Sequence, residues 1–384
     1  MKQRLKSSLA LLATLALAVS LFLIPSGAET DLQALIDAAP AGGTVTLTED
    51  VTISTSLEIN KALTIDGASH ALTYTGSAGA INTQTNDPFT LKNLTLNATA
   101  TGGRGVEMFG SAPIITVDNC TLNVHTRGIS ARSNTPTTGA SVTVNDSVIQ
   151  CTQLPDGRTY DNWAALGDYR GISAWNMKQA VITVTNSTIQ GFAYCINVAG
   201  NQENGIMDTM GTRFQITNCH LKGWTTFNIW GAKSTYDIVK TELLGINVAT
   251  GGTNSFATIV VNDDIYGTQA TDPDAGLTAW ANEINITGGS IKNYASQTTL
   301  DAGLTEQLIR IDKDGVTKIV FSKYGRANVA VQDCAGCCDS ALYSPVWDAE
   351  TMQGYYNNEK LVGKDYCTAV KSDGTTALPL LPAV

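Results

Sequence analysis

The sequence predicts an all-β chain wound as a parallel β-helix, in which short strands stack coil upon coil. Three observations predict it: a unit of two short alternating strands recurs along the chain, one column of that unit holds mostly Gly, Asn or Asp, and most copies lie 22 to 27 residues apart. A repeat of this length buries its apolar face only by stacking on its neighbours. The Leu-x-x-Leu-x-Leu frame of a leucine-rich repeat, the structural competitor, is missing.

The first 28 residues have the pattern of an export signal. Three basic residues precede an apolar run from Leu9 to Ile24, and the segment PSGA that follows offers small residues to a signal peptidase. The run is shorter than the roughly 20 residues that span a bilayer, which favours cleavage over a signal anchor. We therefore expect a secreted, extracellular or cell-surface protein with no membrane segment in its mature form.

The charge of the chain argues against nucleic acid as a partner. The formal net charge is −10, and loss of the predicted signal would remove three basic residues and leave −13. An acidic surface repels phosphate groups, and no Lys/Arg cluster offsets it locally.

A short helix is predicted at the start of the mature chain. Thr30 or Asp31 is a suitable N-cap, the segment LQALI places apolar residues on one face, and Pro40 with the following Gly-Gly pair ends the helix. Such a helix would cover the open end of a coil stack, where strands are unpaired.

Nine copies of the two-strand unit follow, each with a special residue at its centre. These residues are Gly67, Asn93, Asn119, Asp146, Asn186, Asn218, Lys240, Asp263 and Gly288. Gly, Asn and Asp tolerate a left-handed backbone, so the column predicts a one-residue bend between two strands. Apolar residues alternate on both sides of the bend in a phase that keeps one face inward.

The opening helix, the Gly-Gly pair and the bend-marked coils resemble the pectin-lyase-like right-handed parallel β-helix superfamily. They are most similar to its adhesin-like secreted and cell-wall proteins of bacteria, over roughly residues 30 to 300. The resemblance implies a right-handed helix. The enzymes of the superfamily are mostly polysaccharide lyases and glycoside hydrolases, so the resemblance leaves the activity open.

We expect a third strand in each coil, and in three coils this strand begins with an Arg-Gly pair. When these segments are aligned on their central aliphatic residue, they start at Arg104, Arg127, Arg170, Tyr194, Phe227 and Leu244. We expect the arginines at a corner, on the same parity as the inward aliphatic residues, where they bond turn carbonyls or carboxylates. The glycines are expected to allow the tight turn. The alternative is a positive ladder for an acidic polysaccharide.

Two files of side chains point outward in this alignment. One file holds Glu107, Ser130, Ser173, Asn197, Trp230 and Asn247, and the next holds Phe109, Arg132, Trp175, Ala199, Ala232 and Ala249. A sugar ring stacks on an exposed indole, while Arg and Asn bond its hydroxyls. We therefore predict a glycan site of Trp175, Trp230, Arg132, Asn197, Asn247 and Trp163, the last from a long loop after Cys151. The alternative is that the indoles only hold that loop.

Catalytic residues are only weakly indicated. A lyase needs a base and a cation, and a hydrolase needs two carboxylates that flank the bond. The best candidates are Glu107, Arg132, Asp161 and Asp168, and solvated loop carboxylates are the simpler interpretation of the acids. The paired-Asp and Gly-His-Gly motifs of polygalacturonases are missing. Oxygen ligands in the segment from Asp263 to Asp274 make calcium possible, without the spacing of an EF-hand.

The eight cysteines fall into two sets. Cys120 and Cys219 follow a bend and are expected as small core residues, while Cys151 and Cys195 cannot be paired from the sequence. Four more lie near the end, at Cys334, Cys337, Cys338 and Cys367. In an exported chain they predict two disulfides, with a four-thiolate zinc site as the alternative.

We therefore divide the chain into a signal peptide (1–28), a parallel β-helix (29–300) and a Cys-containing C-terminal cap and tail (301–384). The expected function is an adhesin-like monomer that binds a polysaccharide or cell-surface glycan along the outward strip. The alternatives are a lyase or hydrolase of an acidic polysaccharide on the same strip, and a structural spacer without a ligand.

Overall fold

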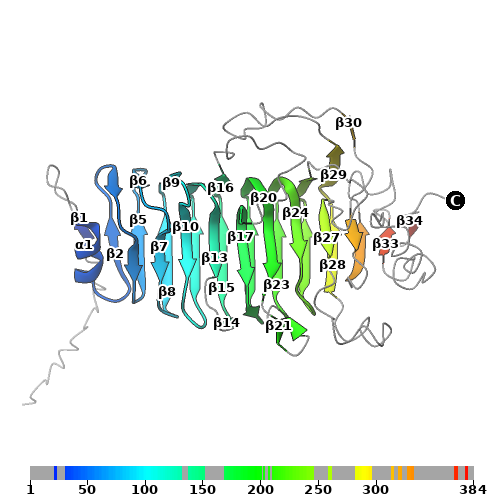
Figure 1. Cartoon of the computed structure of the whole chain (residues 1–384), viewed down its shortest axis with the longest axis horizontal. Helices are drawn as coiled ribbons and strands as arrows, with labels where there is room; N and C mark the ends of the chain where they lie inside the picture. Colours follow the sequence, from blue (N-terminus) through cyan, green and yellow to red (C-terminus); the bar gives the residue numbers. More distant parts are fainter. Residues whose placement is uncertain are drawn as a thin grey trace, which may run out of the picture.

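The computed structural model describes residues 31–131, 137–151, 168–200, 210–245, 258–261 and 282–295, and several short strands elsewhere. Its described part is all-β apart from one helix, and its strands stack in parallel, as in a parallel β-helix (Figure 1). No helix in this part is long and apolar enough to cross a membrane.

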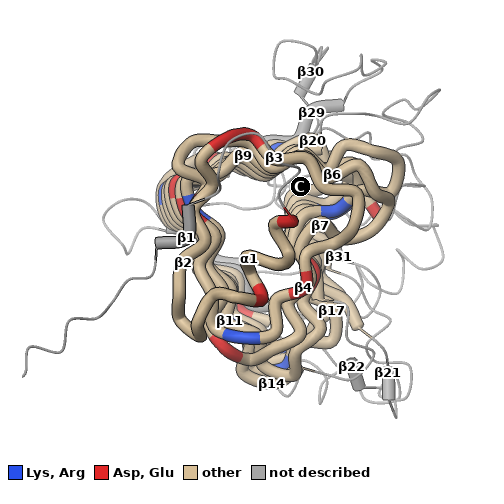
Figure 2. Tube along the Cα trace, turned by 90° about the vertical axis from the view of Figure 1, so that its left-hand side faces the viewer, with Lys and Arg blue, Asp and Glu red and all other residues tan. Residues whose placement is uncertain are grey.

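The helix α1 spans Leu32–Ala38 and has the predicted N-cap. The carboxylate of Asp31 accepts a hydrogen bond from the backbone N–H of Ala34 at 3.1 Å, and Leu32 and Ile36 are buried. The helix lies at the N-terminal end of the strand stack, across the opening seen along its axis (Figures 1 and 2). The strand β1 (Leu21–Leu23), from within the predicted signal, pairs with β2 at the same end.

Each coil contributes strands to three parallel rows. Row one consists of β2 (Gly43–Thr46), β5 (Leu63–Asp66), β8 (Pro88–Lys92), β11 (Ile114–Asp118), β15 (Ser141–Asn145), β19 (Val181–Thr185), β23 (Arg213–Thr217), β25 (Thr235–Val239) and β28 (Asn282–Thr287). Row two consists of β3 (Val51–Ile53), β6 (Ala71–Tyr74), β9 (Thr95–Ala98), β12 (Thr121–Val124), β16 (Val148–Cys151), the first halves of β20 (Thr188–Ala199) and β24 (His220–Ile229), β26 (Glu242–Gly245) and β29 (Ser290–Ala295). Row three consists of β4 (Leu57–Ile59), β7 (Gly79–Thr83), β10 (Arg104–Met108), β13 (Arg127–Ala131), β17 (Arg170–Trp175), the second halves of β20 and β24, β27 (Ile259–Val261) and β31 (Ile319–Phe321).

Short ladders accompany the rows. β14 (Thr137–Thr138) pairs in parallel with β18 (Met177–Lys178), and β21 (Gln202–Glu203) pairs antiparallel with β22 (Ile206–Met207). β30 (Lys313–Asp314) pairs antiparallel with β29.

Parallel pairing also continues past residue 300. β32 (Ala327–Gln332) pairs with β28, β33 (Cys367–Val370) pairs with β32, and β34 (Ala377–Leu378) closes on β33 antiparallel. The predicted boundary at 300 and the cap remain predictions. Cys367 begins β33, and Cys334, Cys337 and Cys338 lie outside the described residues.

The predicted bend column is confirmed at seven positions. The backbone φ is positive, between 46° and 66°, at Asn93, Asn119, Asp146, Asn186, Asn218, Lys240 and Gly288. At the first predicted bend, between β5 and β6, Ala68 and Ser69 take the positive φ instead of Gly67. Gly67 is needed there for space, because a Cβ on it would lie 2.5 Å from the carbonyl oxygen of Asn93.

One predicted copy of the two-strand unit is wrong. The segment that starts at Ile259 was expected in row one, with Asp263 as its bend. In the structure β25 pairs directly with β28, whereas Ile259 pairs with Phe227 in row three. An alternating apolar strand looks alike in either row, and Asp263 itself lies outside the described residues.

The inside of the stack is apolar. Phe214 and Tyr236 are fully buried and stack with ring centroids 4.6 Å apart. Cys120 and Cys219 are buried core residues, as predicted, and Cys151 and Cys195 are buried as well. Burial raises the pKa of the Cys120 thiol to about 11, so this cysteine is an inert core residue.

The bend asparagines form a ladder of side-chain hydrogen bonds on the outside. The amide nitrogen of Asn119 donates to the amide oxygen of Asn93 at 2.9 Å, and Asn218 donates to Asn186 at the same distance. Each bond joins two neighbouring coils, which explains why Asn rather than Gly occupies most bends.

We expect Asn119→Ala to lower the free energy of unfolding by about 1.5 kcal/mol, because alanine loses this bond and resists a φ of 50°. Asn119→Gly should cost less, since glycine tolerates that φ. Urea unfolding of both variants measures the difference. A glycine variant less stable than the alanine variant would contradict this explanation.

Candidate functional site

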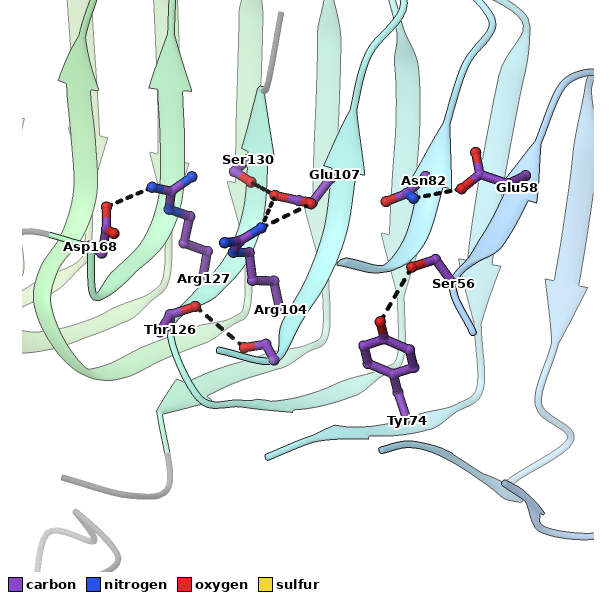
Figure 3. A network of polar contacts seen from close by, with 11 residues as sticks. Ser56, Glu58, Tyr74, Asn82, Arg104, Glu107, Thr126, Arg127, Ser130 and Asp168 are labelled. Atoms are coloured by element: carbon purple, nitrogen blue, oxygen red, sulfur yellow. Dashed lines mark hydrogen bonds and ion pairs between the residues drawn. The ribbon is translucent and has the colours of Figure 1, made fainter. Parts of the chain in front are cut away.

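The outer face of row three carries the candidate site, and the Arg-Gly pairs build it. A Cβ on Gly128 would lie 2.3 Å from Cγ2 of Ile149, and one on Gly171 would lie 2.3 Å from Cγ2 of Ile189. The glycines therefore face the core, and the arginine before each of them lies on the outside, as Figure 3 shows for Arg127. This corrects the prediction, which gave the arginines the inward parity and assigned the glycines to a turn.

The arginines are held by acidic and polar partners on the same face. Nη1 of Arg104 lies 3.3 Å from both carboxylate oxygens of Glu107, and Nη2 of Arg127 donates to Oδ1 of Asp168 at 2.6 Å. Arg170 donates to Oγ of Ser173 at 3.4 Å. The expectation that carboxylates satisfy arginines is confirmed for Arg104 and Arg127.

The two acidic partners differ in exposure. Glu107 is 3% exposed and also accepts a hydrogen bond from Oγ of Ser130 at 3.4 Å. Asp168 is exposed. Partial burial raises the pKa of the Asp168 carboxyl, but the hydrogen bond and charge of Arg127, with the charges of Arg170 and Arg104, outweigh it and hold that pKa below its ordinary value. Asp168 thus stays ionised until the pH falls through this lowered pKa.

We call the side chains in register with Glu107 the polar file. It contains Asn82, Glu107, Ser130, Ser173, Asn197 and Asn228. From Glu107 onward its members are buried, so this part of the predicted strip is less open than expected. Asn197 accepts a hydrogen bond from the amide of Asn228 at 2.8 Å, while its own buried amide nitrogen has no acceptor among the residues that the structure describes.

Sequence reasoning missed the N-terminal end of this face. Asn82 donates to Oε1 of Glu58 at 2.6 Å (Figure 3). Gln84 donates to the other oxygen of Glu58 at 2.8 Å. The register places Glu58, Asn82 and Glu107 in one line across three coils. Glu58, Asn82 and Glu107 lie about one coil length apart in the sequence, and this spacing could have predicted that they share one face.

The aromatic residues form a second line, which we call the aromatic file. Trp175 pairs with Ala199, and Trp230 donates its backbone N–H to Val198 at 2.8 Å, which places it beside Ala199 on the next coil. Trp175 and Trp230 therefore flank Ala199 two coils apart, about 9.6 Å at the usual strand spacing. The prediction had placed Trp230 in the polar file.

This correction has a simple cause. The sequence alignment matched Ile229 with Ile196, but the structure pairs Phe227 with Ile196 and Asn228 with Asn197. The inward position of β24 holds an aromatic residue, so an alignment on aliphatic residues slipped by two. Asn228 takes the place in the polar file that had been given to Trp230.

Both indoles are half-buried and fixed by neighbours. The guanidinium carbon of Arg170 lies 5.8 Å from the ring centroid of Trp175, and Nε1 of Trp230 donates to Oδ1 of Asn228 at 3.0 Å. Ala199 between them is 9% exposed. The indole rings of Trp175 and Trp230 are thus fixed on either side of the Ala199 methyl group, next to the polar file.

Several predicted site residues lie outside the described residues. These are Arg132, Asp161, Trp163, Asn247 and the acidic segment from Asp263 to Asp274. Within the described part, His, Cys, Asp and Glu form no group of three that could hold a metal ion.

Comparison with known proteins identifies no family for this chain. No protein-family model and no curated protein sequence matches the chain. Among solved structures, ORF18 of Geobacillus virus E2 is similar with a TM-score of 0.36 and 11% sequence identity, over 69% of this chain and 54% of that chain. The chain thus spans about half the length of that structure. A likeness this weak carries no argument about activity.

Proposed function

We propose that the protein is an exported, adhesin-like, right-handed parallel β-helix of the pectin-lyase-like kind that binds a polysaccharide or cell-surface glycan along the outer face of row three. The observation that carries the proposal is the pair Trp175 and Trp230, which flank Ala199 in one file. Stacking on an indole face is the main apolar contact that a sugar ring can make. Export and surface location rest on the first 28 residues.

We expect the polar file to supply the complementary hydrogen bonds. Asn197 lies two residues before Ala199, and among the described residues its buried amide nitrogen has no acceptor. An unsatisfied donor costs free energy, which a ligand oxygen would recover once the Asn197 side chain turns outward. The bond from Trp230 to Asn228 holds one indole, and the contact with Arg170 holds the other. Residues fixed in this way lose little conformational entropy when a ligand binds.

Charge favours a neutral glycan over a strongly acidic one. Arg104 and Arg127 are neutralised by Glu107 and Asp168, so they do not offer a positive ladder. The acidic chain as a whole also repels a polyanion.

A polysaccharide lyase or hydrolase stands second. Glu107 is buried in an ion pair, and the lowered pKa of Asp168 makes it a poor proton donor at neutral pH. A general acid needs a pKa near the working pH.

Two predictions about the rest of the molecule stay proposals. We propose that Cys334, Cys337, Cys338 and Cys367 in the C-terminal part form two disulfides. We also propose that the protein is a monomer.

The test is affinity electrophoresis of the protein in gels that contain single polysaccharides, neutral and acidic, with and without calcium. We expect retarded migration with at least one neutral polysaccharide and no release of sugars. Product assays run on the same mixtures decide the alternatives. Release of reducing or unsaturated sugars would show that the protein is an enzyme. Unretarded migration in every gel would favour the third alternative, a structural spacer without a ligand.

A further inference from the structure

Phe109 is the one aromatic side chain among the exposed large apolar residues of the described part. It is 38% exposed, and the other two, Ile114 and Val181, lie in row one. The backbone N–H of Phe109 donates to the carbonyl oxygen of Thr83 at 2.9 Å, so Phe109 continues row three directly after β10. A lone exposed aromatic residue needs no explanation, and its position relative to other rings therefore decides what it indicates.

The register places Phe109 in the aromatic file. Phe109, Trp175 and Trp230 each follow a member of the polar file by two residues. Strand β13 lies between β10 and β17, and β20 lies between β17 and β24. The three aromatic rings therefore recur at every second coil, about 9.6 Å apart at the usual strand spacing.

The surroundings of the file suit an uncharged polymer. Arg104 is paired with Glu107, and Arg127 is paired with Asp168, so these arginines do not attract a polyanion. Ala199, which lies between two of the rings, projects only a methyl group. A chain that lies along the file can therefore rest on the rings without a side chain that stands between Trp175 and Trp230.

The spacing of the rings fits one class of glycan. An extended β-1,4-linked chain is a two-fold ribbon in which each sugar unit advances by slightly more than the strand spacing of about 4.8 Å. The same ring face returns at every second unit, as the aromatic rings return at every second coil. An α-1,4-linked chain curves, so its sugar rings do not follow such a straight line.

We infer that row three binds an uncharged β-1,4-linked glycan in extended form, with one sugar ring on each of Phe109, Trp175 and Trp230. This inference rests on the proposed glycan-binding function, and it adds the linkage of the ligand and a third aromatic contact. The file spans four coil spacings from Phe109 to Trp230, or about 19 Å, which a chain of about five sugar units covers.

Calorimetry with the full-length protein tests the linkage and the length. The probes are cellohexaose, chitohexaose and mannohexaose, with maltohexaose as the α-1,4-linked comparator. We expect at least one β-1,4-linked hexasaccharide to bind about tenfold or more tightly than maltohexaose, because only an extended chain reaches all three aromatic contacts. The same hexasaccharide should bind more tightly than its own trisaccharide, which reaches only two rings.

Phe109→Ala tests the third contact. It should weaken binding of the hexasaccharide about fivefold or more, but binding of the trisaccharide less than about twofold, since the two indoles still accept the shorter chain. Val181→Ala is the matched control, because Val181 is 39% exposed in row one, and it should bind both sugars like the wild type. Circular dichroism confirms that each variant is folded.

The inference is overturned when no β-1,4-linked hexasaccharide binds, or when maltohexaose binds as tightly as the best of them. It is also overturned when Phe109→Ala binds the hexasaccharide like the wild type, or when Val181→Ala weakens binding as much as Phe109→Ala. Affinity electrophoresis decides the proposed function separately. Retardation by any polysaccharide would keep the glycan-binding function although the inference had failed, whereas unretarded migration in every gel would overturn both.

Discussion

Replacing Gly128 by alanine is expected to lower the free energy of unfolding by about 3 kcal/mol, the upper part of the usual cost of overpacking a core. The new Cβ would lie 2.3 Å from Cγ2 of Ile149 and 2.5 Å from the carbonyl oxygen of Gly171. The first contact is with a core side chain and the second with the backbone of the next coil. A rotamer change alone cannot relieve both, so strands β13 and β17 must move apart.

Urea unfolding followed by circular dichroism measures this loss. Thr143→Ala is the matched control, because its side chain is half-buried on the outer face of row one and its loss should cost no more than about 0.5 kcal/mol. Equal stability of the two variants would mean that Gly128 does not face the core. The outward position of Arg127, and with it the layout of the candidate site, would then be wrong.

The bend column shows why so much of the fold was predictable from the sequence. A left-handed residue restricts the amino acid strongly, so Asn93, Asn119 and Asn186 mark their bends without any tertiary information. The alternation around each bend then fixes the inward face. The same reasoning located α1, whose N-cap and apolar face are local features.

Register between distant coils was less predictable. Row one and row three have similar apolar strands, so Ile259 was assigned to the wrong row. Phe227 fills an inward position that other coils give to Val or Ile, and the alignment of β24 slipped by two. Both errors arise where packing, rather than a local backbone preference, decides the position.

The candidate site depends on such registers. The sequence indicated Trp175 and Trp230 as outward residues, but only the pairing of β20 with β24 brings them to either side of Ala199. A cavity of about 320 Å³ on the outer face of row two was missed altogether. Its residues come from four coils between Val148 and Leu244, and unequal loops separate them in the sequence.

The double variant Trp175→Ala, Trp230→Ala is expected to weaken polysaccharide binding at least about 100-fold. Truncating a central aromatic residue of a binding site typically costs about 2 kcal/mol or more, and the two rings share one file. The fold should persist, because both indoles are half-buried on the outer face of the stack. Val181→Ala removes an exposed apolar side chain from row one and is the matched control.

A third variant tests the geometry between the indoles. Ala199→Leu keeps both rings and fills the space that separates them on the surface. We expect it to weaken binding as well, since a branched side chain would keep a sugar ring from lying against its neighbours. Unchanged binding by this variant would mean that the two indoles act separately.

The most direct measurement of the central claim is the retardation of the wild-type protein, the double tryptophan variant and Val181→Ala in one gel series with a bound neutral polysaccharide. We predict equal retardation of the wild type and Val181→Ala, and free migration of the double variant. Retardation of the double variant to the same degree as the wild type would contradict a glycan site on the outer face of row three.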